Sequence, residues 1–528
     1  MTYAGEAVAS MKLRISSRQS DLARIQAYLV ADALRRAHPG LEIEFRFRES
    51  LGDVNQHDPL WKMPERGVFT EDFLADLARG ETDLIVHSWK DLPVADRAET
   101  EIAATLPRAD ARDVLLLKES AWERVSARRR LRVYSSSPRR ARNLEGFLKD
   151  HLPGGIGAVE FVPVRGNIPT RVRKLFEDGE IDALIVAKAA LDRLLSQAPG
   201  APAEETEKFA ATARELRSRL DETRWMVLPL SENPTAAAQG ALAIEIRKDR
   251  ADLRRLLSAI HSEDTARAVR KEREILASYG GGCHQKIGVT ILRREYGEIT
   301  YLRGETDAGE ILDRADLATG EPHPEIDART AWPLPSSDDD SFYERRVRTL
   351  TDAEFRRVSE GRALWIARAN ALPGPVSVDA KTIVWTAGLR TWKRLANHGV
   401  WVNGSAEGLG ENEDPRIDAL AGQVVLWVKL THSPITGLPD DRAGMPSLAT
   451  YDLFPGVHAP NLTGKKDFFW TSGSAFVAAL ARHPEIRGAR HASGPGRTAE
   501  TLRAVLGKDA KIEIELGYSA WLRRVKGL

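Results

Sequence analysis

The sequence predicts an α/β protein made of several domains. At 528 residues the chain is too long for one hydrophobic core, so roughly three or four domains are expected. Near the N-terminus a short strand at 13–15 leads through a polar turn into a helical pattern over 22–34, and an alternating strand follows at 42–48. Strand, turn, helix and strand in this order open a parallel α/β layer, in which ligands bind at the carboxyl ends of the strands.

The composition argues against several classes of protein. The 77 basic and 76 acidic residues give a net charge of +1, whereas a general nucleic-acid binder carries a clear basic excess. A single cysteine cannot form an internal disulfide and fits a reducing compartment. No window approaches the roughly 18 apolar residues that span a bilayer, and residues 1–10 lack the features of a signal peptide. We therefore expect a cytoplasmic protein that binds neither membranes nor nucleic acids.

Loops at the predicted strand ends of the first unit carry charged residues. The first strand runs towards Arg18, and Ser20 or Asp21 can cap the helix that follows. A strand at 83–87 delivers Lys90 and Asp91 to the same edge of the sheet, although a solvated ion pair would give the same pattern. The segment before the next helix adds two basic candidates, Lys62 and Arg66.

A second α/β unit begins near residue 112 and repeats this pattern. A strand at 131–134 runs into three serines ahead of a helix, whose hydroxyl and N–H groups can form an anion-binding nest. A strand at 161–164 ends in another arginine-bearing loop, and a helix at 189–195 carries Arg193. Because arginine grips carboxylates and phosphates through paired hydrogen bonds, arginines at equivalent strand ends predict a ligand with many negative charges. These arginines are Arg18, Arg139, Arg140, Arg165 and Arg171.

The segments between these units set the predicted domain boundaries. Residues 197–224 are interpreted as a loop and a surface helix, and the strands at 225–230 and 241–246 are expected to return to the first sheet. The proline- and serine-rich stretch at 333–341 is a candidate linker. The predicted parts are domain 1 at 11–107 with 226–247, domain 2 at 108–200, an inserted surface segment at 201–225, domain 3 at 248–335 and a C-terminal region at 345–528.

The only cysteine, Cys283, follows three glycines at 280–282. Its simplest interpretation is a small, buried and inert apolar residue. Presentation on a glycine-rich loop instead favours a covalent attachment point or a nucleophile, because glycine lets bulky groups approach the backbone. The residue alone does not decide between these alternatives.

The C-terminal region contains an internal repeat. Trp385–Gly388 recurs as Trp470–Gly473 at an offset of 85 positions (470 − 385), and in each copy an apolar strand precedes the motif and a helix follows it. The repeat predicts two similar α/β halves. The glycine-rich turn at 493–498 opens a further helix and is weak support for phosphate binding.

Seven short motifs stand in order between about residues 13 and 300. They are Arg18-Gln19-Ser20, Gly67-Val68-Phe69-Thr70, His87-Ser88-Trp89-Lys90-Asp91, Ser136-Ser137-Pro138-Arg139-Arg140, Arg165-Gly166-Asn167 with Thr170-Arg171, Gln239-Gly240-Ala241 and Gly281-Gly282-Cys283. Together they resemble the hydroxymethylbilane synthase (porphobilinogen deaminase) family. The resemblance implies two periplasmic-binding-protein-like α/β lobes and a small α+β domain that carries the cysteine. Family enzymes condense four porphobilinogen molecules into linear hydroxymethylbilane and release ammonia.

The resemblance also assigns roles to the matching residues. Asp91 matches the catalytic aspartate, which stabilises the positive charge that deamination creates on a pyrrole, and no metal site is expected. The dipyrromethane cofactor is expected to be bound covalently by Cys283 and held by Lys90, Ser136, Ser137, Arg139, Arg140 and Arg171. Porphobilinogen and the growing polypyrrole are expected to contact Arg18, Ser20, Lys62, Arg66, Phe69, Arg165, Gly166, Asn167, Arg193 and Gln239. The chain departs from the family pattern at Tyr134, Pro138, Ala238 and Lys286.

From about residue 345 the chain resembles uroporphyrinogen-III synthase, which closes hydroxymethylbilane with inversion of the last ring. The matching side chains are Tyr451, Thr471, Ser472 and Thr498. A bifunctional enzyme in tetrapyrrole biosynthesis, with a C-terminal two-lobed α/β region, is therefore the leading hypothesis. The alternatives are an inactive C-terminal scaffold or, for the whole chain, a non-catalytic bilobal module that binds polycarboxylates. The oligomeric state stays open, and a monomer is compatible with the sequence.

Overall fold

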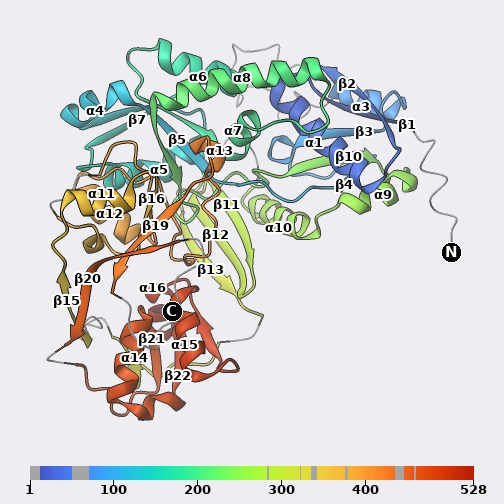
Figure 1. Cartoon of the computed structure of the whole chain (residues 1–528). Coiled ribbons are helices and arrows are strands. Elements are labelled where there is room, and N and C mark those ends of the chain that lie inside the picture. The colour runs from blue at the N-terminus through green and yellow to red at the C-terminus, as the bar shows by residue number, and fades with distance from the viewer. Residues whose placement is uncertain are drawn as a thin grey trace. The chain divides into compact units, whose positions relative to one another are not determined.

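The computed structural model describes residues 12–49, 71–281, 285–320, 323–334, 342–374, 378–433, 445–456 and 459–527 (Figure 1). The chain divides into two compact units. The first comprises residues 1–149, 156–293 and 300–314, and the second comprises residues 150–155, 294–299 and 315–528.

The first lobe of the first unit is built on a five-stranded sheet in the order β2-β1-β3-β10-β4. Its strands are β1 (Lys12–Arg18), β2 (Glu42–Arg48), β3 (Leu84–Ser88), β4 (Thr100–Ala104) and β10 (Leu242–Arg247), and its helices are α1 (Asp21–Ala37), α3 (Glu71–Ala78) and α9 (Ala251–Leu257). β1 is parallel to β2 and β3, whereas β10 is antiparallel to β3 and β4. Val30 and Leu34 of α1 and Leu253 of α9 share a buried core with Leu13 and Ile244. The predicted α/β opening of the chain is confirmed.

The second lobe has a sheet of the same size in the order β7-β6-β8-β5-β9. Its strands are β5 (Asp113–Lys118), β6 (Arg130–Tyr134), β7 (Ala158–Val162), β8 (Ala183–Ala187) and β9 (Thr223–Leu228), and its helices are α4 (Trp122–Arg128), α5 (Pro138–His151), α6 (Ile168–Glu177) and α7 (Lys188–Leu195). β6 is parallel to β7 and β8, and β5 is antiparallel to β8 and β9. The two lobes therefore share one design, with a parallel sheet completed by an antiparallel strand.

One strand prediction was wrong. The segment at 225–230 was expected to return to the first sheet, but β9 pairs with β5 in the second, with Met226 opposite Leu115. The helix before it, α8 (Ala203–Asp221), leaves only Glu222 as a connection, which is too short for the chain to leave the lobe where that helix ends. The strand at 241–246 does return to the first sheet, as β10.

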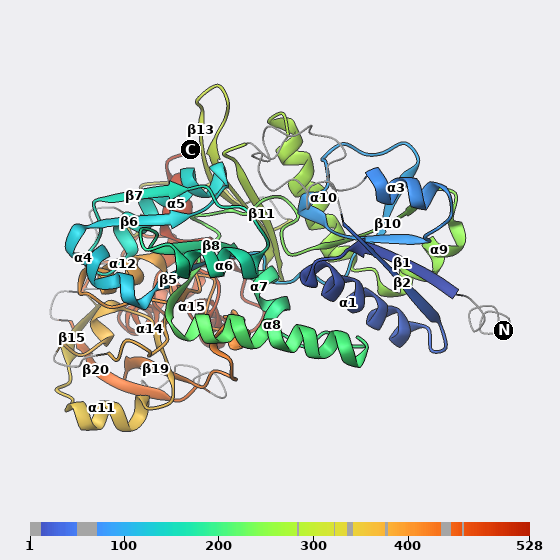
Figure 2. The same ribbon diagram turned by 90° about the horizontal axis from the view of Figure 1, so that it is seen from above.

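Helix α8, in the inserted segment, contacts both lobes. Near its start, Lys208 Nζ lies 3.0 Å from Asp21 Oδ1 on α1 of the first lobe. Towards its end, the Arg219 guanidinium lies 4.8 Å from the centre of the Phe176 ring on α6 of the second lobe. Figure 2 shows the helix running from α6 towards α1. The predicted surface helix is therefore a bridge between the lobes.

A small α+β domain, as predicted, lies mostly in the first unit, while residues 294–299 and 315–318 of its sheet are counted with the second. The domain consists of α10 (Glu263–Ser278) and a three-stranded sheet of β11 (Gly288–Arg294), β12 (Gly297–Glu305) and β13 (Ile311–Ala318). Ile287 and Val289 pack with Leu302 in its core. Gly280 and Gly281, which precede the cysteine, both have positive φ angles, +99° and +64°, that glycine adopts without strain. Cys283 itself lies outside the described residues.

The second unit contains two α/β halves. The first half is a six-stranded sheet in the order β15-β20-β19-β16-β17-β18. Its elements are β15 (Tyr343–Val347), α11 (Asp352–Ser359), β16 (Ala363–Ile366), β17 (Val384–Thr386), α12 (Leu389–Asn397), β18 (Gly404–Ser405), α13 (Asp418–Ala421), β19 (Trp427–His432) and β20 (Ser447–Pro455). The strands from β20 through β19, β16 and β17 to β18 are parallel, and β15 pairs antiparallel with β20 at the edge.

The second half is a four-stranded parallel sheet in the order β14-β21-β22-β23. Its elements are β14 (Ala331–Trp332), β21 (Asp467–Trp470), α14 (Gly473–Arg482), β22 (Arg490–Ser493), α15 (Arg497–Leu506), β23 (Ile512–Ile514) and α16 (Tyr518–Val525). The internal repeat corresponds to β17 with α12 and to β21 with α14, so the prediction of two α/β halves is confirmed. The predicted end of domain 3 at residue 335 was wrong, because β14 already belongs to this sheet. A two-residue strand is too short to be recognised by alternation.

Candidate active site

Lys90 and Asp91 lie where the first sheet meets residues 229–241, the crossing segment, which joins β9 of the second lobe to β10 of the first. β3 ends at Ser88, and a short 3-10 helix (Trp89–Asp91) follows, fixed by the buried Trp89 ring and by a 3.1 Å hydrogen bond from Trp89 N to Ala241 O. Asp91 is exposed, and Lys90 is half-buried. Lys90 Nζ donates to Gln239 Oε1 at 3.2 Å, and burial lowers the pKa of Lys90 although the charge of Asp91 opposes this. The pair therefore differs from an ordinary solvated ion pair.

Arg171 interacts electrostatically both with Asp91 and with other arginines of the second lobe. It lies on α6 and donates from Nε to Gly166 O at 2.7 Å. The pKa of Arg171 is lowered to about 10, first by burial and then by the positive charges of Arg140 and Arg165, while the negative charge of Asp91 acts against them. Asp91, Arg140 and Arg165 are therefore each near enough to Arg171 to influence its charge.

Gly166 has a structural reason to be glycine. Its φ angle is +112°, and a β-carbon would lie 2.9 Å from Thr170 Cγ2. Asn167 caps α6, because its Oδ1 accepts from Thr170 N at 2.9 Å. This turn sets the start of the helix that carries Arg171.

Arg139 and Arg140 bind a buried carboxylate that the sequence analysis missed. Both side chains, on α5, are buried and form ion pairs with Asp113, at 3.0 Å and 2.6 Å respectively. Asn233 Nδ2 and Gln239 Nε2 also donate to Asp113, at 2.9 Å and 2.8 Å. We call these five residues the Asp113 cluster. Burial by itself raises the pKa of Asp113, but Arg140 and Arg139 reverse the effect and hold it well below its ordinary value. One sequence feature could have indicated the site: an aspartate directly before the four apolar residues 114–117 of a strand.

Several predicted contact residues have local hydrogen bonds of their own. Ser20 caps α1, and Ser137 Oγ accepts from Arg140 N at 3.4 Å near the start of α5. Ser136 Oγ donates to Val164 O at 2.7 Å and accepts from Val164 N at 2.8 Å, which joins the ends of two strands. Ligand binding by these residues stays a prediction.

Arg193 binds the backbone of the crossing segment instead of lying at an open sheet edge. Its Nη2 donates to Gly240 O at 2.8 Å, and burial lowers the pKa of Arg193 to about 10. Gly240 has a φ angle of +90°, and a β-carbon there would lie 2.6 Å from Ala109 O, so only glycine fits. Arg18 is the last, half-buried residue of β1. Three further predicted residues, Lys62, Arg66 and Phe69, lie outside the described residues.

The departures from the family pattern are accommodated locally. Ala238 adopts a φ angle of +67°, a left-handed conformation that costs an alanine about 1–2 kcal/mol. Tyr134 donates to Asp178 Oδ2 at 2.6 Å, and burial together with this bond raises its pKa to about 12. Pro138 occupies the start of α5, and Lys286 pairs with Glu305 at 2.6 Å.

Three of the four predicted C-terminal residues share one sheet edge. Thr471 and Ser472 follow β21, and Thr498 lies in the first turn of α15 after β22, which is the neighbouring parallel strand. Ser472 caps α14. Tyr451 instead is buried in β20 of the other half, with its ring centre 5.8 Å from that of His432.

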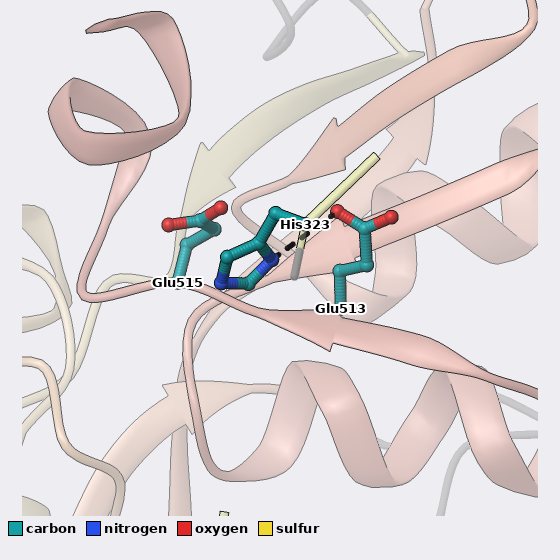
Figure 3. A group of neighbouring side chains, drawn as sticks. All are labelled: His323, Glu513 and Glu515. Atoms are coloured by element: carbon teal, nitrogen blue, oxygen red, sulfur yellow. Dashed lines mark ion pairs between the residues drawn. The ribbon is translucent and has the colours of Figure 1, made fainter. Parts of the chain in front are cut away.

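One group of possible metal ligands occurs in the described part of the chain. Ligand atoms of His323, Glu513 and Glu515 lie within 4.8 Å of one another (Figure 3). Arg524 Nη1 already pairs with both carboxylates, with 3.0 Å to Glu513 Oε2. The arginine supplies the positive charge that a metal would bring, so the group does not indicate a metal site. Within the described ranges, no helix has the length and apolarity needed to cross a membrane.

Comparison with known proteins identifies the N-terminal region. Residues 13–255 match the family model "Porphobilinogen deaminase, dipyromethane cofactor binding domain". Porphobilinogen deaminase 1 of Streptomyces avermitilis is 33% identical over 320 residues, which are 59% of this chain and 89% of the relative. The chain belongs to the porphobilinogen deaminase family. The deaminase of Acidothermus cellulolyticus is 38% identical over 292 residues (53% of this chain, 76% of the relative), and that of Clostridium novyi is 29% identical over 308 residues (58% and 92%).

The family assignment covers the N-terminal part of the chain. This part is a porphobilinogen deaminase, a transferase that uses porphobilinogen and contains the domain that binds the dipyrromethane cofactor. Its two sheets form the α/β lobes that were predicted. These three relatives match at most 59% of the chain, so they do not speak to the activity of the C-terminal unit.

Proposed function

We propose that the chain is a hydroxymethylbilane synthase in which Asp91 is the catalytic carboxylate and Cys283 carries the dipyrromethane. The observation that carries this proposal is the meeting of one exposed carboxylate, Asp91, with cationic groups from both lobes. Lys90 comes from the first lobe, and Arg165 and Arg171 come from the second. A substrate that gains a pair of carboxylates with every unit needs such an excess of positive charge.

The residues present suit a dipyrromethane. Arg171, whose pKa is lowered by burial and by other cations, and Lys90, whose pKa is lowered by burial, gain from an added anion, because it offsets the cost of keeping their charges out of water. The cofactor supplies, when bound, the pyrrole carbon to which the first substrate is joined. The exposed carboxylate of Asp91 can accept hydrogen bonds from pyrrole N–H groups and stabilise positive charge that develops on the substrate.

The attachment of the cofactor can be tested by intact mass. The purified protein is expected to be heavier than its sequence by two pyrrole units, and the Cys283→Ser variant is expected to lose that increment. An unmodified mass in active wild-type protein would refute the attachment.

The role of Asp91 can be tested by Asp91→Asn. We expect the variant to fold normally and to lose at least about 100-fold in kcat, the size of effect typical for a carboxylate that assists proton transfer or stabilises charge. Asp96→Asn, an exposed aspartate five positions along the same loop, is the matched control and should retain activity. Near-normal production of bilane by Asp91→Asn would sink the assignment.

For the C-terminal unit we propose uroporphyrinogen-III synthase activity. Support comes from its two α/β halves and from the position of Thr471, Ser472 and Thr498 at the carboxyl edge of adjacent parallel strands, where ligands bind in such sheets. The test is the ring isomer that the purified full chain makes from porphobilinogen. The type III isomer supports the proposal. Only the type I isomer, from spontaneous closure, would indicate an inactive scaffold, and tight binding without turnover would indicate a non-catalytic module.

A further inference from the structure

The side chains of the Asp113 cluster are joined to one another by internal hydrogen bonds. Asp113, the first residue of β5, is completely buried, and its two oxygens accept five hydrogen bonds. Oδ1 accepts from Arg140 Nη2 at 2.6 Å and Gln239 Nε2 at 2.8 Å. Oδ2 accepts from Arg139 Nη2 and Arg140 Nε, both at 3.0 Å, and from Asn233 Nδ2 at 2.9 Å. A carboxylate bonded on all sides defines the orientation of every group that donates to it.

The orientation of the two guanidinium groups follows from these bonds. Arg139 Nη1 also donates to Asn233 Oδ1 and Pro234 O, both at 2.8 Å, so Arg139 ties α5 to the crossing segment. Arg140 presents its Nε and Nη2 edge to Asp113 and donates from Nη1 to Ile185 O at 3.2 Å on β8. Neither side chain can turn without breaking a charge-assisted bond to Asp113.

Through Gln239, Asp113 also affects the orientation of a side chain in the first lobe. Gln239 Nε2 is bound to Asp113 Oδ1 and to Ala111 O at 2.6 Å, so Gln239 Oε1 must face Lys90, from which it accepts at 3.2 Å. A side-chain amide with only one anionic acceptor beside it has only one favourable orientation. Asp113 therefore determines which end of the Gln239 amide meets the lysine that precedes Asp91.

The charges of these groups support the same conclusion as their hydrogen bonds. Lys90, Arg139 and Arg140 carry three positive charges, and Asp113 is the fully buried anion among them. Burial lowers the pKa of Lys90, and the charge of Asp113 raises it, against Arg140 and Arg139. The carboxylate thus lets several cations coexist beside the substrate site while leaving an excess of positive charge for an anionic ligand.

We propose that Asp113 is a positioning residue for the deaminase reaction, which orients Arg139 and Arg140 in one lobe and, through Gln239, Lys90 in the other. The proposal rests on the proposed function of the first unit. It assigns Asp113 no contact with substrate or cofactor. Its effect reaches the reaction through the four side chains that it holds in place.

The test compares Asp113→Asn with Asp182→Asn in the purified full chain. Asp182 is a suitable control because it is also a buried aspartate of the second lobe. It pairs with Arg124, accepts from Arg132 N at 2.8 Å, and precedes the end of β8 that lies away from Asp113, which is opposite Ala187. We expect Asp113→Asn to lower kcat about 10- to 100-fold, the usual cost of losing a group that orients a functional side chain, with a smaller change in KM. A kcat within threefold of wild type, or equal to that of Asp182→Asn, would overturn the proposal.

A second measurement follows Lys90 directly and needs no turnover. The pH dependence of Lys90 acetylation by acetic anhydride, read by peptide mass, gives the pKa of its amine. Asp113→Asn is expected to lower that pKa because it removes the negative charge that raises it, whereas Asp182→Asn should leave it unchanged. An unchanged Lys90 pKa in Asp113→Asn contradicts the coupling between Asp113 and Lys90.

A third variant covers the case in which Asp113→Asn does not fold. Asn233→Ala removes one donor to Asp113 and one acceptor of Arg139 but keeps the charge of Asp113. We expect it to lower kcat several-fold while the pKa of Lys90 stays the same; full activity would count against positioning. If wild-type protein has no dipyrromethane mass increment and makes no bilane, the proposed function fails, and the acetylation result still decides whether Asp113 controls Lys90.

Discussion

Each of the two units places a buried carboxylate between cations, but with different surroundings. In the first unit Asp113 pairs with Arg139 and Arg140, and a further cation, Lys90, lies close by. In the second unit Glu411, from the segment after β18, pairs with Lys429 Nζ at 2.6 Å and with Arg497 Nη1 at 3.1 Å. We call these three residues the Glu411 cluster.

The Glu411 cluster joins two halves rather than forming an edge for a ligand. Lys429 lies on β19 of the first half, and Arg497 begins α15 of the second. Beside it the backbones touch: a β-carbon on Gly496 would lie 2.7 Å from Gly410 Cα, and one on Gly410 would lie 3.0 Å from Gly496 Cα. Both clusters thus consist of a buried anion between two cations. In the first unit the anion allows several cations to lie close together, and in the second unit it links two sheets.

The largest effect is expected from a substitution that breaks the Asp113 cluster. Asp113→Ala should destabilise the deaminase unit by about 3–5 kcal/mol, because it leaves buried arginines without their counter-charge. The measurement is urea denaturation of the full chain followed by unit-specific hydrogen exchange. Protection in the second unit should be unchanged, and equal losses in both units would contradict the assignment of the cluster to one of them.

The next effect tests the close approach in the second unit. Gly496→Ala should cost about 3 kcal/mol, since it combines a left-handed conformation at φ +97° with a clash against Gly410. Gly507→Ala is the matched control: its φ angle is +114°, but a β-carbon there has no neighbour within 4 Å. Thermal unfolding should show a clearly larger loss for Gly496→Ala. Equal losses would mean that backbone strain, not the contact between the halves, accounts for the effect.

A smaller effect is a pH dependence of stability in the mildly acidic range that is expected in the second unit and not in the first. His491 is buried in the second half, accepts from Trp470 Nε1 at 3.0 Å, and lies 3.0 Å from Ile486 O through Nε2, and burial lowers its pKa to about 4. The unfolded chain takes up a proton on His491 below pH 6.5, whereas the folded chain does so only near pH 4. Stability is therefore lost as the pH falls through this window, by about 2 kcal/mol between pH 6.5 and pH 5.

Calorimetry at pH 7 and pH 5 checks this expectation. The transition of the second unit should shift to lower temperature on acidification, and His491→Gln should reduce the shift. His398→Gln, at an exposed histidine of the other half, serves as the control and should behave like wild type. Asp113 also contributes less at low pH, but in a lower window: its depressed pKa keeps its contribution intact down to about pH 4, and that contribution is lost only on further acidification. A uniform response of both units at pH 5 would contradict the role of His491.

The sequence was sufficient where a local pattern decides the structure. The pattern of residues 13–34 predicted the first strand and helix, and Ser20, one of two candidates for the cap, does cap that helix through a short-range hydrogen bond. The repeat around Trp385 and Trp470 predicted the two halves of the second unit, because the same strand and helix recur in both.

Long-range partners were beyond that reasoning. The sequence shows Arg139 and Arg140 as cations ready for a ligand, but not that Asp113, 26 positions earlier than Arg139, already binds them. The misplacement of β9 has the same origin, since the choice between two apolar sheets depends on where α8 ends. Propensity and periodicity report neighbours along the chain, whereas ion pairing and sheet membership are settled by packing.

Helix α8 has a mechanical consequence for the first unit. A helix of 19 residues is about 28 Å long and does not stretch, because each turn is held by its own hydrogen bonds. One end is fastened to α1, through Lys208 and Asp21, and the other to α6, through Arg219 and Phe176. Separation of the two lobes along the line of this helix therefore requires the contacts at one of its ends to break.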